Sequence, residues 1–151
     1  MRRSEREIRD EKGIHEILEK GLVCRLGLYD GQYPYVVPMN YGYRDGRLYF
    51  HCAREGRKIE ILKINDRVCI EVDIDTRITR GDTPCRWATK YRSVIGFGRA
   101  RIINEENGKK AGLDVILAHY GGSGVGYDET SMQRTAVIEV VLESMTGKQS
   151  L

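Results

Sequence analysis

The stretch that decides the fold is residues 68–75, Val-Cys-Ile-Glu-Val-Asp-Ile-Asp, in which every second residue is apolar. Successive side chains of a β-strand point to opposite faces of the sheet. This alternation therefore predicts a strand with one face in the core and one polar face. Working outward from it, similar patterns predict five further strands, at residues 22–29, 35–43, 48–52, 91–103 and 135–143.

The segments between these strands are short and rich in turn residues. Asp-Gly pairs at 30–31 and 45–46 are typical of tight hairpins. Three short helices are predicted, one from Asp10 to Gly21, one from Gly56 to Asn65, and one capped by Asn104. Residues 76–90 have no regular pattern and are interpreted as a loop.

Hairpin connections favour an antiparallel sheet over a parallel one, which needs helical crossovers. The sequence therefore predicts one domain over residues 1–151, mainly β with short helices (α+β). The sheet is expected to be an antiparallel, closed or half-closed barrel of six or more strands.

Composition narrows the class of protein. The 151 residues include 25 Lys and Arg against 22 Asp and Glu, well mixed, which argues against a nucleic-acid partner. No apolar run approaches the length of a membrane span, and the charged start Met1–Glu7 is unlike a signal peptide. The cysteines form no C-x-x-C pair and the histidines are scattered, so no metal site is expected. These features together predict a cytoplasmic protein with free thiols.

The sequence Gly56-Arg57-Lys58 at a strand-to-helix turn is the first candidate binding site. Free backbone N–H groups at a helix start and two adjacent cations are suited to a phosphate monoester. A solvated basic helix start is the alternative, and spacing alone leaves both open.

Three further features are candidates for chemistry. Pro38 cannot donate to a strand ladder, so it marks an edge, a bulge or a bend and can re-aim Met39 and Asn40 toward a ligand. Polar residues 91–93 lie at the start of a predicted strand, where they can reach a ligand at the barrel rim. The alternative is that Arg92 pairs with an acidic residue. His51 ends a strand shortly before the Arg57–Lys58 pair.

Taken together, several segments resemble the pyridoxamine 5′-phosphate oxidase-like FMN-binding proteins, within them the nitroimidazole-resistance (Nim-type) branch. The resemblance spans nearly the whole chain in the family's order and is carried by residues 37–41, 48–58, 91–100, 134–137 and 145–148. It implies a split β-barrel homodimer with FMN between the subunits and a small-molecule substrate.

By matching position, the resemblance also assigns the site. Arg57 and Lys58 would hold the FMN phosphate, helped by His51 and Cys52. Other residues would line the isoalloxazine ring or lie near the ring or phosphate, namely Val37, Pro38, Met39, Asn40, Arg92 and Ser93. In the Nim-type branch the matching histidine is tied to activity, which makes His51 the candidate catalytic residue.

The resemblance has departures that bear on the reaction. Pyridoxamine phosphate oxidases carry a further Arg-x-His element and a tryptophan near the flavin, whereas this sequence ends at Leu151 and has its one tryptophan at Trp87. Some relatives of this barrel bind deazaflavin or haem. The sequence therefore predicts an FMN-dependent oxidoreductase, with a non-catalytic flavin, deazaflavin or haem module as the alternative.

Overall fold

Strand β6 (Arg67–Thr79), which contains the alternating stretch, lies between two antiparallel neighbours in the sheet. The structure, a computed structural model, describes residues 3–124 and 126–151. The strands of these residues are β1 (Glu7–Ile8), β2 (Cys24–Tyr29), β3 (Pro34–Met39), β4 (Gly42–Arg44), β5 (Arg47–Ala53), β6, β7 (Ala88–Ile103) and β8 (Thr135–Ser150). The helices are α1 (Glu11–Lys20), α2 (Arg57–Ile64), α3 (Glu106–His119) and α4 (Glu129–Arg134), with 3₁₀ turns at Ser4–Arg6 and Pro84–Arg86.

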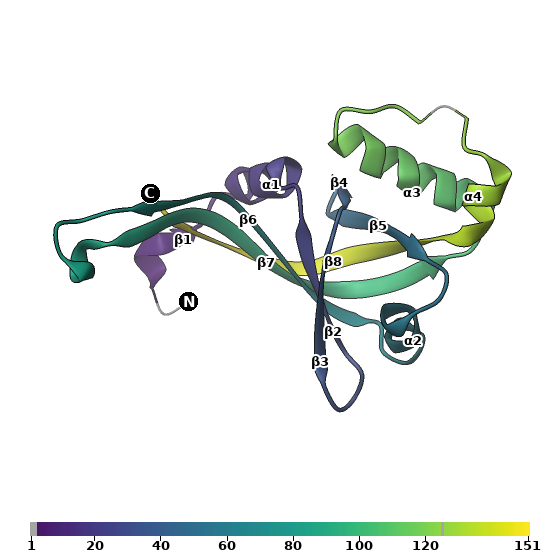
Figure 1. Cartoon of the computed structure of the whole chain (residues 1–151), viewed down its shortest axis with the longest axis horizontal. Helices are drawn as coiled ribbons and strands as arrows, with labels where there is room; N and C mark the ends of the chain where they lie inside the picture. Colours follow the sequence, from purple (N-terminus) through teal and green to yellow (C-terminus); the bar gives the residue numbers. More distant parts are fainter. Residues whose placement is uncertain (1–2, 125) are drawn as a thin grey trace.

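The strand order shows how the sheet closes. Its path is β3-β2-β6-β7-β8-β5-β4, and β1 pairs with β8 beside it. Strands β3 and β4 stand at the two ends of this path, yet only Asn40 and Tyr41 separate them in the chain. The sheet must therefore curl until its edges are neighbours (Figure 1), which confirms the predicted antiparallel, half-closed barrel with short helices.

The apolar residues of each strand fill the barrel. Leu26, Ile70 and Ile138 are fully buried, as the alternation predicts. Helix α1 covers one end of the barrel with Ile17 and Leu18. Its predicted cap is confirmed, because the Asp10 carboxylate accepts hydrogen bonds from the Lys12 and Gly13 amides, both at 3.2 Å.

Helix α3 covers the outer side of β4 and β5 (Figure 1). Gly42 permits this, because a Cβ there would lie 2.6 Å from backbone atoms of Val115 and Ile116. The predicted cap at Asn104 is wrong. Glu105 holds the N-cap position and its side chain makes no capping bond.

The predicted loop over residues 76–90 is wrong at both of its ends and holds only for residues 80–87 between the strands. Strand β6 continues to Thr79, β7 begins at Ala88, and residues 77–79 pair with residues 88–90. The hairpin projects beyond the barrel as an arm (Figure 1). Both faces of such an arm contact water, so it needs no apolar alternation and gives no periodic signal.

Three more differences concern element bounds. The predicted strand 35–43 is two strands, since the Tyr41 amide donates to the Tyr120 hydroxyl at 3.1 Å instead of continuing a ladder. Strand β8 runs on to Ser150, and α4 and β1 were not expected. Among the described residues, no helix is both long and apolar enough to cross a membrane.

Candidate functional site

The start of α2 has the geometry of an anion site. Gly56 has φ of 120° and ψ of 167°, a conformation that favours glycine, and it directs the chain from β5 into the helix. The first amides of a helix have no hydrogen-bond partner within the helix. The N–H groups of Arg57 and Lys58 are therefore free to donate to a ligand, and they form the positive end of the helix dipole. The predicted cationic pair is therefore placed at a helix N-terminus.

Arg57 joins this helix start to the turn between β2 and β3. Its Nη2 donates to Asp30 Oδ2 at 3.2 Å, and its guanidinium lies 5.0 Å from the ring centroid of Tyr35. The side chain is still 54% exposed, which leaves room for a second partner. Backbone N–H groups of Tyr33 and Gln32, and then Arg57, hold the pKa of Asp30 below its usual range.

Lys58, the second cation of the helix start, acts electrostatically on Cys52 near the end of β5. Burial raises the pKa of the Cys52 thiol, and the positive charge of Lys58 partly offsets that rise. Cys52 packs against the core, whereas His51 precedes it in β5, points to the opposite face and is exposed. The structure therefore places His51 and Cys52 on opposite faces of β5, although the two are adjacent in the sequence.

The predicted ring-lining residues lie on β3, at one end of the strand path. Val37 and Met39 pack against the core, while Pro38 and Asn40 are exposed. The edge position explains how the strand tolerates Pro38, and the strand ends at Met39. Asn40 Nδ2 already donates to the Tyr120 hydroxyl at 3.3 Å, so part of its hydrogen-bonding capacity serves the fold.

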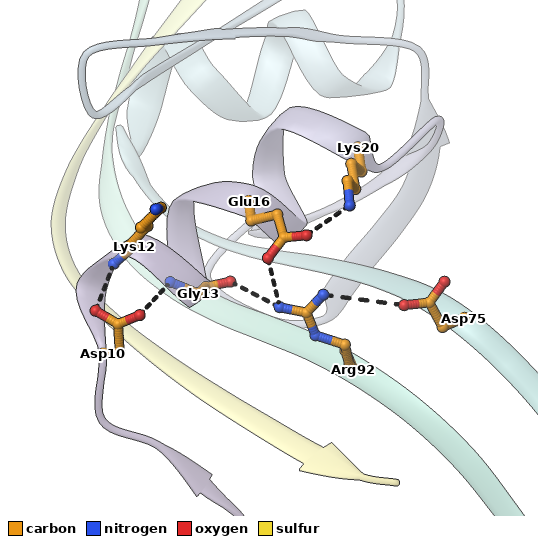
Figure 2. A network of polar contacts seen from close by, with 7 residues as sticks. All are labelled: Asp10, Lys12, Gly13, Glu16, Lys20, Asp75 and Arg92. Atoms are coloured by element: carbon orange, nitrogen blue, oxygen red, sulfur yellow. Dashed lines mark hydrogen bonds and ion pairs between the residues drawn. The ribbon is translucent and has the colours of Figure 1, made fainter.

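Arg92 lies elsewhere, against α1 (Figure 2). Its Nη2 is 3.1 Å from Glu16 Oε2 and 3.5 Å from the Gly13 carbonyl oxygen, and Nη1 lies 4.0 Å from Asp75 Oδ2. Only 16% of its side chain is exposed. The alternative in which Arg92 pairs with an acid is thus the one that the structure shows.

The ion pair between Glu16 and Arg92 makes acid stability testable. The hydrogen bond from Arg92 lowers the pKa of Glu16 from 4.5 to about 2, helped by the bond from Lys20. Because the pKa of Glu16 is lower in the folded than in the unfolded protein, its ionised carboxylate stabilises the fold at a pH above 4.5. This stabilisation is lost as the pH falls from 4.5 toward about 2.

Replacing Glu16 with glutamine is therefore expected to remove part of the acid sensitivity. Urea unfolding should show a stability difference between wild type and Glu16→Gln at about pH 6 that shrinks at about pH 2.5. Glu19→Gln on the same helix is the control. A wild-type advantage that stays constant across this window would contradict the assignment.

Five of the predicted site residues thus fall into two groups. Arg57, Lys58 and Cys52 surround the start of α2. Arg92 and Ser93 pair with Ile74 and Asp73 in the later half of β6, by α1. Helices α1 and α2 lie on different sides of the barrel (Figure 1), so one chain does not bring the two groups together.

An apolar patch covers the outer face of the sheet between these groups. The register places Val36, Gly27, Cys69 and Phe97 side by side across β3, β2, β6 and β7. Ile95 extends the patch along β7, and Ser93 lies on the same face by the two-residue period. We call Val36, Cys69, Ile95 and Phe97 the outer patch. Val36, Cys69 and Phe97 line a shallow hollow of about 520 Å³.

Charged pairs flank the outer patch. On one side Arg25 bonds to Glu71 at 3.1 Å and to Asp73 at 2.5 Å. On the other side Arg99 bonds to Asp66 at 3.0 Å. An exposed apolar centre with a charged rim has the anatomy of a protein interface.

Sequence reasoning missed the partners of Arg57. The sequence predicts a hairpin turn at Asp30, and for Tyr35 it predicts packing first and a stacking surface for a flavin or substrate second. Neither pattern indicates a contact with a residue more than 20 positions away. The outer patch was missed as well, because it forms only when four strands align.

The curled antiparallel sheet, with a helix start at its rim, defines the class of split β-barrel proteins. More specifically, the chain belongs to the pyridoxamine 5′-phosphate oxidase family, since the model of that family matches residues 10–149. No curated protein matches the sequence.

Solved structures agree with this assignment. A candidate 5-nitroimidazole antibiotic resistance protein from Bacteroides thetaiotaomicron is 32% identical, with a TM-score of 0.84 over 95% of this chain and 86% of that one. The flavocytochrome Anf3 from Azotobacter vinelandii is 19% identical with a TM-score of 0.85, covering 100% and 72%. A FAD-binding protein from Mesorhizobium loti is 23% identical with a TM-score of 0.70, covering 97% and 98%.

Proposed function

We propose that this protein binds FMN and acts as an oxidoreductase that passes electrons or hydride to a small organic acceptor. The observation that carries the proposal is the helix start at Gly56, where Arg57 and Lys58 stand beside free backbone amides. This donor set fits a phosphate monoester, and the neighbouring edge strand β3 offers backbone and side-chain contacts for a flat ring. When bound, the flavin would supply the redox chemistry, and the protein would bind and orient it.

We further propose that the site is completed by a second copy of the chain. Ser93 lies on the face of the outer patch, far from Lys58 in the same chain. A twofold contact through the outer patch would carry Ser93 of one copy toward the helix start of the other. The proposed catalytic residue, His51, would act from its exposed position on β5.

One observation favours a second candidate function. Within residues 3–124 and 126–151, the His51 side chain has no hydrogen-bond partner that would orient it as an acid or base. A flavin, deazaflavin or haem carrier without turnover would have no need of such a partner. Steady-state oxidation of NAD(P)H with a nitroaromatic or quinone acceptor separates the two functions.

The decisive experiment on the cofactor is the absorption spectrum of freshly purified protein, followed by chromatography of the released cofactor. Flavin bands and released FMN would support the proposal, and a Soret band would replace FMN with haem. Colourless protein that fails to change the fluorescence of added FMN would refute it.

We also propose a cytoplasmic location for this activity. All four cysteines are free thiols, and Cys24 is fully buried. A reducing compartment keeps such thiols unpaired.

A further inference from the structure

A cavity of about 600 Å³ lies at the end of the barrel opposite the arm, between α2, α3 and α4. Its volume is in the range of small-molecule sites. Helix α2 contributes Ile59 and Lys63 to it but neither Arg57 nor Lys58. The cavity is therefore separate from the proposed phosphate site and needs its own explanation.

Lys109 is the unusual residue of this cavity. It is only 9% exposed, and its Nζ donates to the backbone carbonyl of Met132. An ammonium has three N–H donors, and no carboxylate lies within ion-pair distance of this one in the described part of the chain. A buried cation without an anionic partner is costly unless something supplies the missing charge.

The carboxylates of the lining supply it only in part: the charge of Lys109 helps to lower the pKa of Glu106, but the two form no ion pair in the described residues. Glu106 is 2.5 Å from the Nζ of Lys110, and Glu129 accepts from Gln133 at 3.3 Å. Arg54 and Lys63 add two more cations to the wall. The lining thus carries three cations against two carboxylates, and this net positive charge favours an anion.

The uncharged part of the lining is mixed. Its apolar side chains are Ile59, Ile102, Ile103, Met132 and Ala136, and its polar ones are Asn104, Gln133 and Thr135. From the unpaired Lys109 and the apolar side chains we propose that the cavity binds a small organic acid, its carboxylate on Lys109 and its apolar body among the isoleucines. Such a ligand supplies the missing negative charge and fills the hollow between the three helices.

Benzoate is the probe that tests this site in the full chain, with its neutral isostere benzamide beside it. Titration followed by amide NMR should show saturable shifts around Lys109 and Met132, with a Kd on the order of 1 mM for benzoate. Benzamide and the variant Lys109→Met should each weaken binding by about 10-fold or more. Lys12→Met, an exposed lysine on α1, should bind as wild type does.

A second readout separates ligand binding from a structural role of Lys109. Saturating benzoate should raise the Tm of wild type by about 3 °C and leave that of Lys109→Met nearly unchanged. Lys109→Arg, which keeps the charge, should retain the effect. If Lys109→Met does not fold, Ala136→Leu tests the same site by filling the cavity and should abolish benzoate binding.

Three results would overturn the proposal: no saturable shifts with wild type, equal affinity for benzamide, or unchanged benzoate affinity in Lys109→Met or Ala136→Leu. The NMR test is independent of the proposed flavin site, because the amide shifts are followed at Lys109 and Met132 in the cavity and not at Lys58.

Discussion

Replacing both Arg57 and Lys58 with alanine is expected to weaken FMN binding by at least about 100-fold. The two side chains stand at the start of α2, where the backbone amides alone would remain as donors. A charge-assisted hydrogen bond contributes about 1.5–3 kcal/mol, so two of them account for a loss of this size. Fluorescence quenching of FMN at constant ionic strength measures it.

The single variants should differ, because Arg57 has another partner. Its contact with Asp30 at 3.2 Å must be shared or released when a phosphate binds, whereas Lys58 forms no such ion pair in the described residues. We expect the larger loss from Lys58→Ala. The double variant Arg9→Ala, Lys12→Ala makes the same change in charge near α1 and is the control. Equal FMN affinity in all variants would place the phosphate elsewhere.

Introducing aspartate at Phe97 is expected to raise the dissociation constant of the proposed homodimer by at least about 100-fold. Phe97 is 56% exposed in the single chain and is the member of the outer patch that follows Cys69 across the sheet, on β7. A twofold interface meets the same patch on both sides, so one substitution buries two unpaired carboxylates. Sedimentation velocity over a range of protein concentrations measures the change.

The same variant tests whether the flavin site is shared. If Ser93 reaches the flavin from the second copy, monomeric Phe97→Asp should bind FMN more weakly than the wild-type dimer does. Leu117→Asp, an equally drastic change of an exposed apolar residue on α3, should leave both properties unchanged. A wild-type protein that is monomeric at about 10 µM, or a Phe97→Asp variant that remains dimeric, would contradict the assignment of the interface.

Local patterns predicted most of the strands, because the alternation of apolar and polar residues indicates directly which side chains face the core. The same reasoning limited Pro38 to an edge, a bulge or a bend, of which the structure shows the edge, and it predicted the start of a helix at Gly56. These features depend on a few neighbouring residues. The register of the long strands and the curl of the sheet depend on distant pairings, and no local pattern records them.

The site was predictable to the extent that it is local. Arg57 and Lys58 are adjacent in sequence, and their position at a helix start followed from Gly56. The contact of Arg92 with Glu16 joins residues 76 positions apart, so its preference for α1 over a ligand was open until the fold was known. The arm over residues 76–90 was unpredictable because its side chains face water on both sides.

The position of β8 has a consequence for how the protein is made. Residues 135–150 form the strand that pairs with β7, β5 and β1 at once. A nascent chain that has grown only to residue 134 therefore leaves β5 and β7 with unpaired edges. Such edges are prone to pair with strands of other chains. We expect the barrel to close only after β8 has left the ribosomal exit tunnel, and chains stalled before that point to require a chaperone.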